Sequence, residues 1–196
     1  MGAHESMEHS EHAQHASSSN KRIALLIAVI ALFLALSETL GKSAQTEALN
    51  LNIEASNLWA FFQAKTIRMT AVRTAAEGLQ TQLEKETDPA FKAAADKRVD
   101  FWQKTAQRYD DEPETNEGRK QLVARAKKAE EKRDLAFAKY HHFEVASAAF
   151  QIGIVLASAT IITGMVLLSW GAIALAAIGI GFTGIGLFAP HAVHLF

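Results

Sequence analysis

The charged residues of this chain are distributed so unevenly that they restrict the folds open to it. Residues 43–142 carry 17 Lys and Arg and 16 Asp and Glu, whereas residues 145–196 carry none of these four residue types. A helix that crosses the ~30 Å hydrocarbon core of a bilayer needs about 20 mainly apolar residues. The pattern therefore predicts an all-α integral membrane protein in which a polar segment separates two apolar regions.

Three apolar runs are long enough to span a bilayer, at residues 23–40, 145–168 and 172–188. Trp170 and Gly171 are expected to connect the second and third runs, because Trp favours the headgroup level and Gly a tight turn. The first run is expected to be an uncleaved anchor rather than a signal peptide, because an acidic tail precedes it and no small-residue cleavage site follows. The expected organisation is a disordered tail at 1–20, a transmembrane helix at 21–41, a soluble helical hairpin at 42–144, a transmembrane hairpin at 145–189 and a short tail at 190–196.

In the polar segment, apolar residues recur alternately three and four positions apart, which is the spacing of coiled-coil helices. Asp88 and Pro89 form a stop and restart signal, because Asp caps a helix N-terminus and Pro favours the first helical position. These features predict a long antiparallel, coiled-coil-like stalk with its tip near Pro89. Its expected inner face comprises Leu51, Ala55, Leu58, Phe62, Met69, Val72, Ala76, Leu79 and Leu83, interrupted by Lys65, and, on the returning helices, Phe91, Ala95, Val99, Trp102, Ala106, Tyr109, Leu122, Ala126, Ala129, Ala136, Tyr140 and Phe143.

Near the C-terminus, Gly179, Gly181 and Gly184 spell G-x-G-x-x-G, the pattern of a dinucleotide-binding turn. Such a turn follows a strand and is followed about 20 residues later by an acidic residue, and neither is present here. The glycines instead fit small-residue faces that let helices approach closely in lipid. The predicted transmembrane packing residues are Gly153, Ala157, Gly164, Ala172, Ala176, Gly179, Gly181, Gly184 and Gly186.

Trp59, Phe61 and Phe62 lie within four residues of one another in the predicted stalk. One interpretation is a second packing face against the returning helix or a neighbouring subunit. The other is a partner interface, because aromatic residues are enriched at binding hot spots.

Titratable residues near the ends of the apolar runs are candidates for an ion or pH response. Glu38 is either an interfacial residue that reaches water or an ion-handling carboxylate, since acids within spans are costly and often functional. His141, His142 and Glu144 form either an ordinary interfacial cluster or a pH sensor, because histidine titrates near neutral pH.

The N-terminal tail holds His4, His9, His12 and His15 among glutamates, a composition that permits weak metal binding as well as simple disorder. The chain has no Cys, no recognisable nucleophile–base pair and no phosphate loop, so no enzymatic activity and no cofactor are predicted. A formal charge of −1 gives no reason to expect nucleic acid as a partner. Basic residues that flank the runs favour a cytoplasmic stalk.

Several stretches together resemble a family of bacterial membrane proteins, the domain of unknown function 4337. They are the His/Glu-rich start, "KRIALL", "EASNLWAFFQAKTIR" and "HHFEVASAAFQIGIVLASATIITG". The resemblance implies a bacterial inner-membrane protein with one N-terminal and two C-terminal spans, and it brings no activity or site residues.

The function predicted from these features is a homo-oligomeric scaffold or partner-docking assembly in the lipid bilayer, with an as yet unknown protein as a second candidate partner. The alternative is a small oligomeric channel or transporter built around the glycine-rich hairpin. Metal binding by the tail is a weaker alternative.

Overall fold

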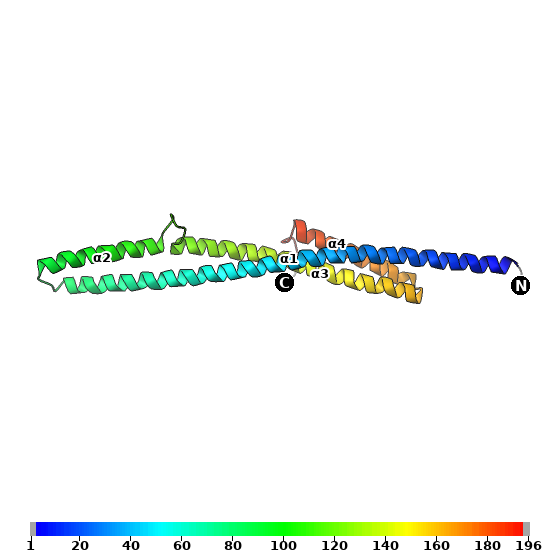
Figure 1. Ribbon diagram of the computed structural model, residues 1–196, viewed down its shortest axis with the longest axis horizontal. Helices are drawn as coiled ribbons and strands as arrows, with labels where there is room; N and C mark the ends of the chain where they lie inside the picture. Colours follow the sequence, from blue (N-terminus) through cyan, green and yellow to red (C-terminus); the bar gives the residue numbers. More distant parts are fainter. Residues whose placement is uncertain (1–2, 194–196) are drawn as a thin grey trace. The chain divides into compact units, whose positions relative to one another are not determined.

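The computed structural model describes the backbone of residues 3–193 and the side chains of residues 21–193. Within this part of the chain the secondary structure is helical and contains no strand, which confirms the all-α prediction. The helices are α1 (Ala3–Leu83), α2 (Pro89–Asp110), α3 (Arg119–Thr163) and α4 (Val166–Phe188) (Figure 1). The chain divides into two compact units, unit 1 from Met1–Ala48 and Asp134–Phe196, and unit 2 from Leu49–Arg133.

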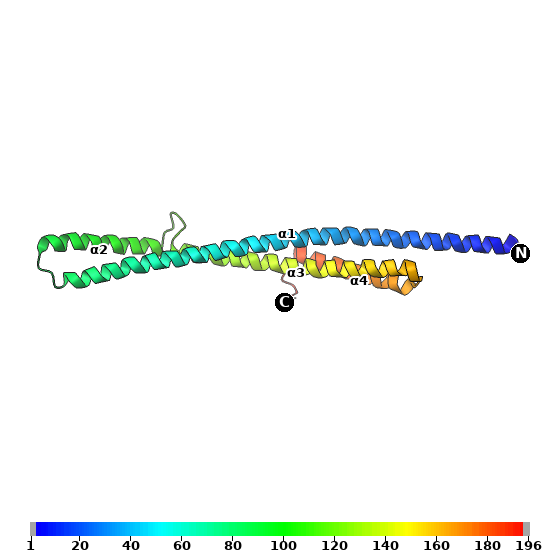
Figure 2. The ribbon, with the colours of Figure 1, turned by 60° about the horizontal axis from the view of Figure 1, so that its bottom comes forward.

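Unit 1 joins the first part of α1 to the second part of α3 and to α4, which lie side by side in both views (Figures 1 and 2). Phe33 of α1 and Phe150 of α3 stack with ring centroids 6.1 Å apart. The Ser37 hydroxyl, which is fully buried, donates a hydrogen bond to the Phe143 carbonyl at 3.0 Å. The core of the unit is made of Ile30, Ala146, Phe150, Ala157 and Ala172.

Three helices contain segments long and apolar enough to cross a membrane by length and composition, within Lys21–Leu83, Arg119–Thr163 and Val166–Phe188. Only 11%, 33% and 22% of their most apolar windows are buried inside the protein. Apolar surface of this extent is normally covered by lipid or by another protein. The fold is therefore compatible with a membrane protein.

The connection between the second and third apolar segments lies earlier than the sequence suggested. α3 ends at Thr163, Gly164 adopts a left-handed φ of +69°, and Met165 is the N-cap of α4. A residue without a Cβ takes this conformation at little cost, which explains why the chain turns here. The prediction of a turn at Trp170 and Gly171 was wrong, because both residues lie inside α4.

In unit 2, α2 and the beginning of α3 follow one another along the second part of α1 (Figures 1 and 2). The restart signal is confirmed, since the Asp88 side chain accepts a hydrogen bond from the Ala90 amide at 2.9 Å and Pro89 begins α2. Phe91 is an exception to the predicted inner face, because it is 44% exposed. The predicted face is otherwise buried or half-buried, with Ala55, Leu58, Met69, Ala76, Ala95, Val99, Ala106, Leu122, Ala126 and Ala129 as its fully buried members within the unit.

Candidate functional site

The aromatic cluster of α1 packs inside unit 2 rather than facing away from it. Trp59, Phe61 and Phe62 are all half-buried against the apolar cluster that includes Leu122. The Trp59 Nε1 donates to Glu130 Oε1 of α3 at 2.9 Å, and the Trp59 and Phe62 rings meet edge to face at 5.7 Å. This geometry favours the packing interpretation of the three aromatic residues over a partner interface.

Lys65, the apparent interruption of the apolar face, is the centre of a buried ion pair. It is 6% exposed, and its Nζ lies 3.1 Å from Glu112 Oε2. The ammonium group also lies over the rings of Phe61 and Tyr109, at 5.5 and 5.3 Å from their centroids. The hydrogen bond from Lys65 is the main cause that holds the pKa of Glu112 below its usual range. This ion pair was not predicted from the sequence. The features that could have indicated it are a single Lys within an apolar repeat and an acidic loop later in the chain.

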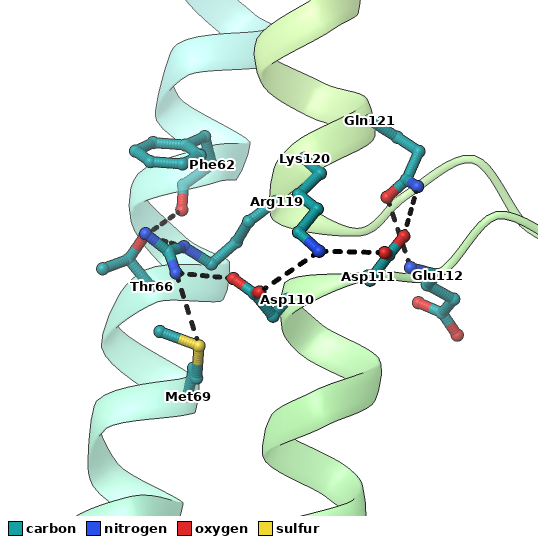
Figure 3. Close-up of polar contacts among 9 residues, drawn as sticks. All are labelled: Phe62, Thr66, Met69, Asp110, Asp111, Glu112, Arg119, Lys120 and Gln121. Atoms are coloured by element: carbon teal, nitrogen blue, oxygen red, sulfur yellow. Dashed lines mark hydrogen bonds and ion pairs between the residues drawn. The ribbon is translucent and has the colours of Figure 1, made fainter.

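Arg119, the first residue of α3, ties the loop before it to α1 (Figure 3). Its Nε donates to Thr66 Oγ1 at 2.9 Å, its NH1 group donates to Asp110 Oδ1 at 2.9 Å, and its guanidinium lies 5.0 Å from the Phe62 ring centroid. Asp111 accepts hydrogen bonds from Gln121 and then Lys120, which together lower its pKa, the Gln121 bond most. These contacts are structural, because they provide hydrogen-bond partners for polar groups of the loop within the unit.

Three of the predicted packing glycines bring α4 against α3. A Cβ atom at Gly179 would lie 2.6 Å from the Phe150 ring, and one at Gly186 would lie 3.0 Å from the Phe143 ring. A Cβ at Gly153 would lie 3.4 Å from the Ala172 carbonyl oxygen. The predicted alanines Ala157 and Ala172 are fully buried, and Ala176 packs against the same core.

The other three predicted glycines have different surroundings. Gly164 lies in the turn, outside both helices, so it is not part of a packing face. A Cβ atom at Gly181 or Gly184 would have no neighbour within 4 Å in the described part of the chain. Both lie on α4 with the exposed residues Ala174 and Ala177, and we call these four residues the outer stripe of α4.

Glu38 and Glu144, named separately from the sequence, line one groove in unit 1. The groove has a volume of about 490 Å³ and lies between α1 and α3, and we call it the α1–α3 groove. Gln151 Nε2 donates to Glu38 Oε1 at 3.2 Å across it. Its lining residues are Ser37, Glu38, Gly41, Lys42 and Gln45 of α1, and Tyr140, Phe143, Glu144, Ser147, Ala148 and Gln151 of α3.

The negative charge of Glu144 acts on two neighbouring side chains of α3, Tyr140 and His141. Burial, followed by the Glu144 charge and a hydrogen bond with Glu144, raises the pKa of Tyr140. His141 Nδ1 lies 3.7 Å from Glu144 Oε2. A cation near the Glu144 carboxylate is favoured, and a further anion is disfavoured, because opposite charges attract and like charges repel.

His142 belongs to a different environment from the groove. It is 1% exposed, stacks on Phe182 of α4 at 6.1 Å, and its Nε2 lies 3.0 Å from the Pro190 carbonyl oxygen. Because a carbonyl only accepts, Nε2 carries the proton and donates to it. The structure thus separates His142 from the other residues predicted to respond to ions or pH.

The predicted metal ligands His4, His9, His12 and His15 lie outside the described side chains, so metal binding in the tail stays a prediction. The backbone of residues 3–20 is the first part of α1. Among the side chains that are described, no group of three His, Asp or Glu residues is placed to hold a metal ion.

Residues 19–189 match the model of a protein family described as a domain of unknown function, DUF4337. The chain belongs to the DUF4337 family. This match confirms the resemblance seen in the sequence and covers the whole of α2, α3 and α4. Comparison with curated proteins and with solved structures finds no match.

Proposed function

We propose that this DUF4337 protein is a non-catalytic membrane scaffold that assembles from several copies of itself. In this proposal the apolar segments of α1, α3 and α4 anchor the chain in the bilayer, and the helices of unit 2 form a coiled-coil-like stalk. The stalk then joins copies together and offers a docking surface to a protein partner.

The observation that carries the proposal is an uncovered apolar face on the charge-rich unit. Leu49, Ile53 and Ile67 are 53%, 58% and 70% exposed. With the exposed Ala60 they recur at intervals of four and seven residues, so they share one side of α1, opposite the buried side at Leu58. We call these four residues the outer face of α1. Single exposed apolar residues are normal in proteins, but an aligned series on a helix indicates a contact surface.

A second copy of the chain is the occupant that fits this face. The face has the spacing of helix–helix contacts, and a two-helix stalk buries little surface by itself. The outer stripe of α4 provides a parallel argument within the bilayer. A Cβ atom at either of its two glycines would have no neighbour within 4 Å among the described residues, and small residues of this kind allow a helix of another copy to approach closely.

We further propose a location in the bacterial inner membrane with unit 2 on the cytoplasmic side. Lys42 follows the first apolar run, and Arg125, Lys127, Lys128, Lys132, Arg133 and Lys139 precede the second. An excess of basic residues near the spans favours the cytoplasmic side.

Single-cysteine cross-linking in native membranes tests the assembly directly, because the chain has no cysteine of its own. Ile53→Cys and Ile67→Cys are expected to form disulfide-linked dimers under mild oxidation. Thr70→Cys, which is exposed on α1 but off the outer face, is the matched control. If neither Ile variant forms more dimer than Thr70→Cys, the proposed contact through α1 is wrong.

The α1–α3 groove supports a second candidate, a small oligomeric channel or transporter. Glu38 and Glu144 lie together beside apolar helix segments, where carboxylates often handle ions. Reconstituted vesicles are then expected to conduct ions, and Glu38→Gln is expected to change the rate or selectivity. An absence of flux under every gradient and pH would remove this candidate.

A further inference from the structure

We propose that the α1–α3 groove binds the ethanolamine-phosphate headgroup of a membrane phospholipid. The proposal rests on the membrane insertion proposed above, but not on the assembly of copies. It assigns a ligand class to a groove that is lined by two carboxylates and one lysine.

The first argument is the position of the groove along both helices. Its α1 wall begins at Ser37, within the apolar run at residues 23–40, and ends at Gln45, beyond it. Its α3 wall begins at Tyr140, before the apolar run that starts at residue 145, and ends at Gln151 inside that run. Both walls therefore change from polar to apolar sequence across the same groove, which is the level at which headgroups lie.

The second argument is the charge of the lining. Glu38 and Glu144 are acceptors only, and they suit the three N–H donors of a primary ammonium group. Lys42 suits the phosphate that lies next to the ammonium in the same headgroup. Two carboxylates and one lysine thus match a zwitterion, whereas a purely anionic headgroup leaves both carboxylates facing negative charge.

The third argument is the apolar surface that continues from the groove. Ala148 lines the groove, and Ile152 and Val155 follow it on the same face of α3, at 53% and 65% exposure. This exposed track gives an acyl chain a place to lie when the headgroup occupies the groove. The track favours a lipid over a free, water-soluble ethanolamine phosphate.

The size of the groove and its side chains are compatible with a phospholipid headgroup. A volume of about 490 Å³ is within the range of ~300–1,000 Å³ that is usual for small-molecule sites. The described side chains hold no group of three His, Asp or Glu that would ligate a bare metal ion. A headgroup that carries both hydrogen-bond donors and acceptors can pair with more of the lining side chains than a bare metal ion can.

Native mass spectrometry of the full-length protein in mild detergent tests the proposal. Phosphatidylethanolamine is expected to be retained about tenfold better than phosphatidylcholine, because the trimethylated nitrogen of choline has no N–H to donate. The double variant Glu38→Gln with Glu144→Gln is expected to lose most of this preference. The double variant with Asp at both positions keeps the carboxylates and is expected to recover part of it.

The control is Glu47→Gln, since Glu47 is an exposed acid on α1 that does not line the groove. It is expected to retain phosphatidylethanolamine as the unchanged protein does. Lys42→Gln is expected to weaken retention of phosphatidylethanolamine and phosphatidylcholine alike, because both carry the phosphate. Helical circular dichroism of each variant shows that a loss of lipid is not a loss of fold.

Three outcomes would overturn the proposal. The first is equal retention of phosphatidylethanolamine, phosphatidylcholine and phosphatidylglycerol, and the second is full retention by the Gln double variant. The third is displacement of the lipid by soluble glycerophosphoethanolamine at equal concentration, which would assign the site to a free metabolite. The protein mass measured in the same spectra tests the scaffold proposal separately. A single copy that retains the lipid would contradict assembly and would still support lipid binding in the groove.

Discussion

The two units of the molecule hold their helices together in different ways. In unit 1, α3 and α4 meet through Gly and Ala, so closely that a Cβ atom at Gly179 would lie 2.6 Å from the Phe150 ring. In unit 2, α1 and its partners meet through aromatic rings and charged groups, with the buried Lys65 paired to Glu112 at 3.1 Å. The α3–α4 contact of unit 1 depends on small residues, whereas the contacts around Lys65 in unit 2 depend on large and charged side chains.

This difference reflects the solvents in which we propose that the units lie. In lipid the hydrophobic effect does not drive helices together, so close packing of small residues supplies the contact energy. In water, buried aromatic surface drives association, and a buried charge is tolerated only where a partner and hydrogen bonds compensate it. The comparison predicts that substitutions of similar size change the stability in opposite directions, depending on what surrounds the substituted residue.

The largest effect is expected from a single methyl group added to α4. Gly179→Ala places a Cβ against the Phe150 ring and is expected to destabilise the α3–α4 contact by about 1–3 kcal/mol. Gly181→Ala, on the same helix with no neighbour within 4 Å, is expected to leave stability unchanged or raise it by up to about 1 kcal/mol through helix propensity. Thermal unfolding in detergent distinguishes them, and equal effects would show that α4 does not pack as described.

Next in size is the asymmetry within the buried ion pair of unit 2. Glu112→Gln leaves the Lys65 ammonium, 6% exposed, without a counter-charge, so the unfolding temperature is expected to fall. Lys65→Met removes the buried charge and leaves Glu112 beside Arg108, 3.6 Å away, so a smaller effect is expected. If Lys65→Met is the more harmful variant, the contacts of the Lys65 ammonium with the Phe61 and Tyr109 rings outweigh the cost of leaving it without a counter-charge.

A smaller effect is expected where an aromatic residue of unit 2 makes a polar contact. Trp59→Phe removes the hydrogen bond from Nε1 to Glu130 at 2.9 Å and is expected to cost about 1 kcal/mol. A double-mutant cycle with Glu130→Ala, which removes the acceptor, separates the pairwise contribution of the hydrogen bond from the change in ring size. A coupling energy indistinguishable from zero would show that the aromatic packing alone fixes this segment.

The smallest expected effect is a dependence of the stability of unit 2 on acidic pH. Hydrogen bonds hold the pKa values of Glu112 and Asp111 below their unfolded values, the first from Lys65 and the second chiefly from Gln121. A carboxyl group whose pKa is lowered on folding contributes stability above its unfolded pKa of about 4, and this stability is lost as the pH falls through the folded pKa. The stability difference between the unchanged protein and Glu112→Gln is therefore expected to shrink below about pH 4. A constant difference down to pH 2 would contradict the assignment of the shift to Lys65.

The helices could be predicted from the sequence because each depends on residues that are close together along the chain. The apolar spacing of α1 and the Asp88–Pro89 restart are local signals, and both were confirmed. The turn at Gly164 was missed because residues 145–188 are apolar throughout, so hydropathy alone contains no boundary.

The sites were predicted less completely because they depend on which residues face each other. Glu38 and Glu144 are 106 positions apart in sequence (144 − 38), and only the packing of α1 on α3 brings them to one groove. Lys65 appeared to be an interruption, since nothing in its surroundings indicates that Glu112 will compensate it. Gly179 and Gly181 read alike in sequence, yet one is covered by an aromatic ring and the other is open.

The particle mass of the full-length protein in lipid nanodiscs tests the central claim of assembly most directly. The proposal predicts protein mass equal to an integral multiple, at least twofold, of the 21.3 kDa chain. It also predicts that Ile53→Ser combined with Ile67→Ser lowers that multiple. A nanodisc population that holds one chain at every protein concentration would contradict the proposed scaffold.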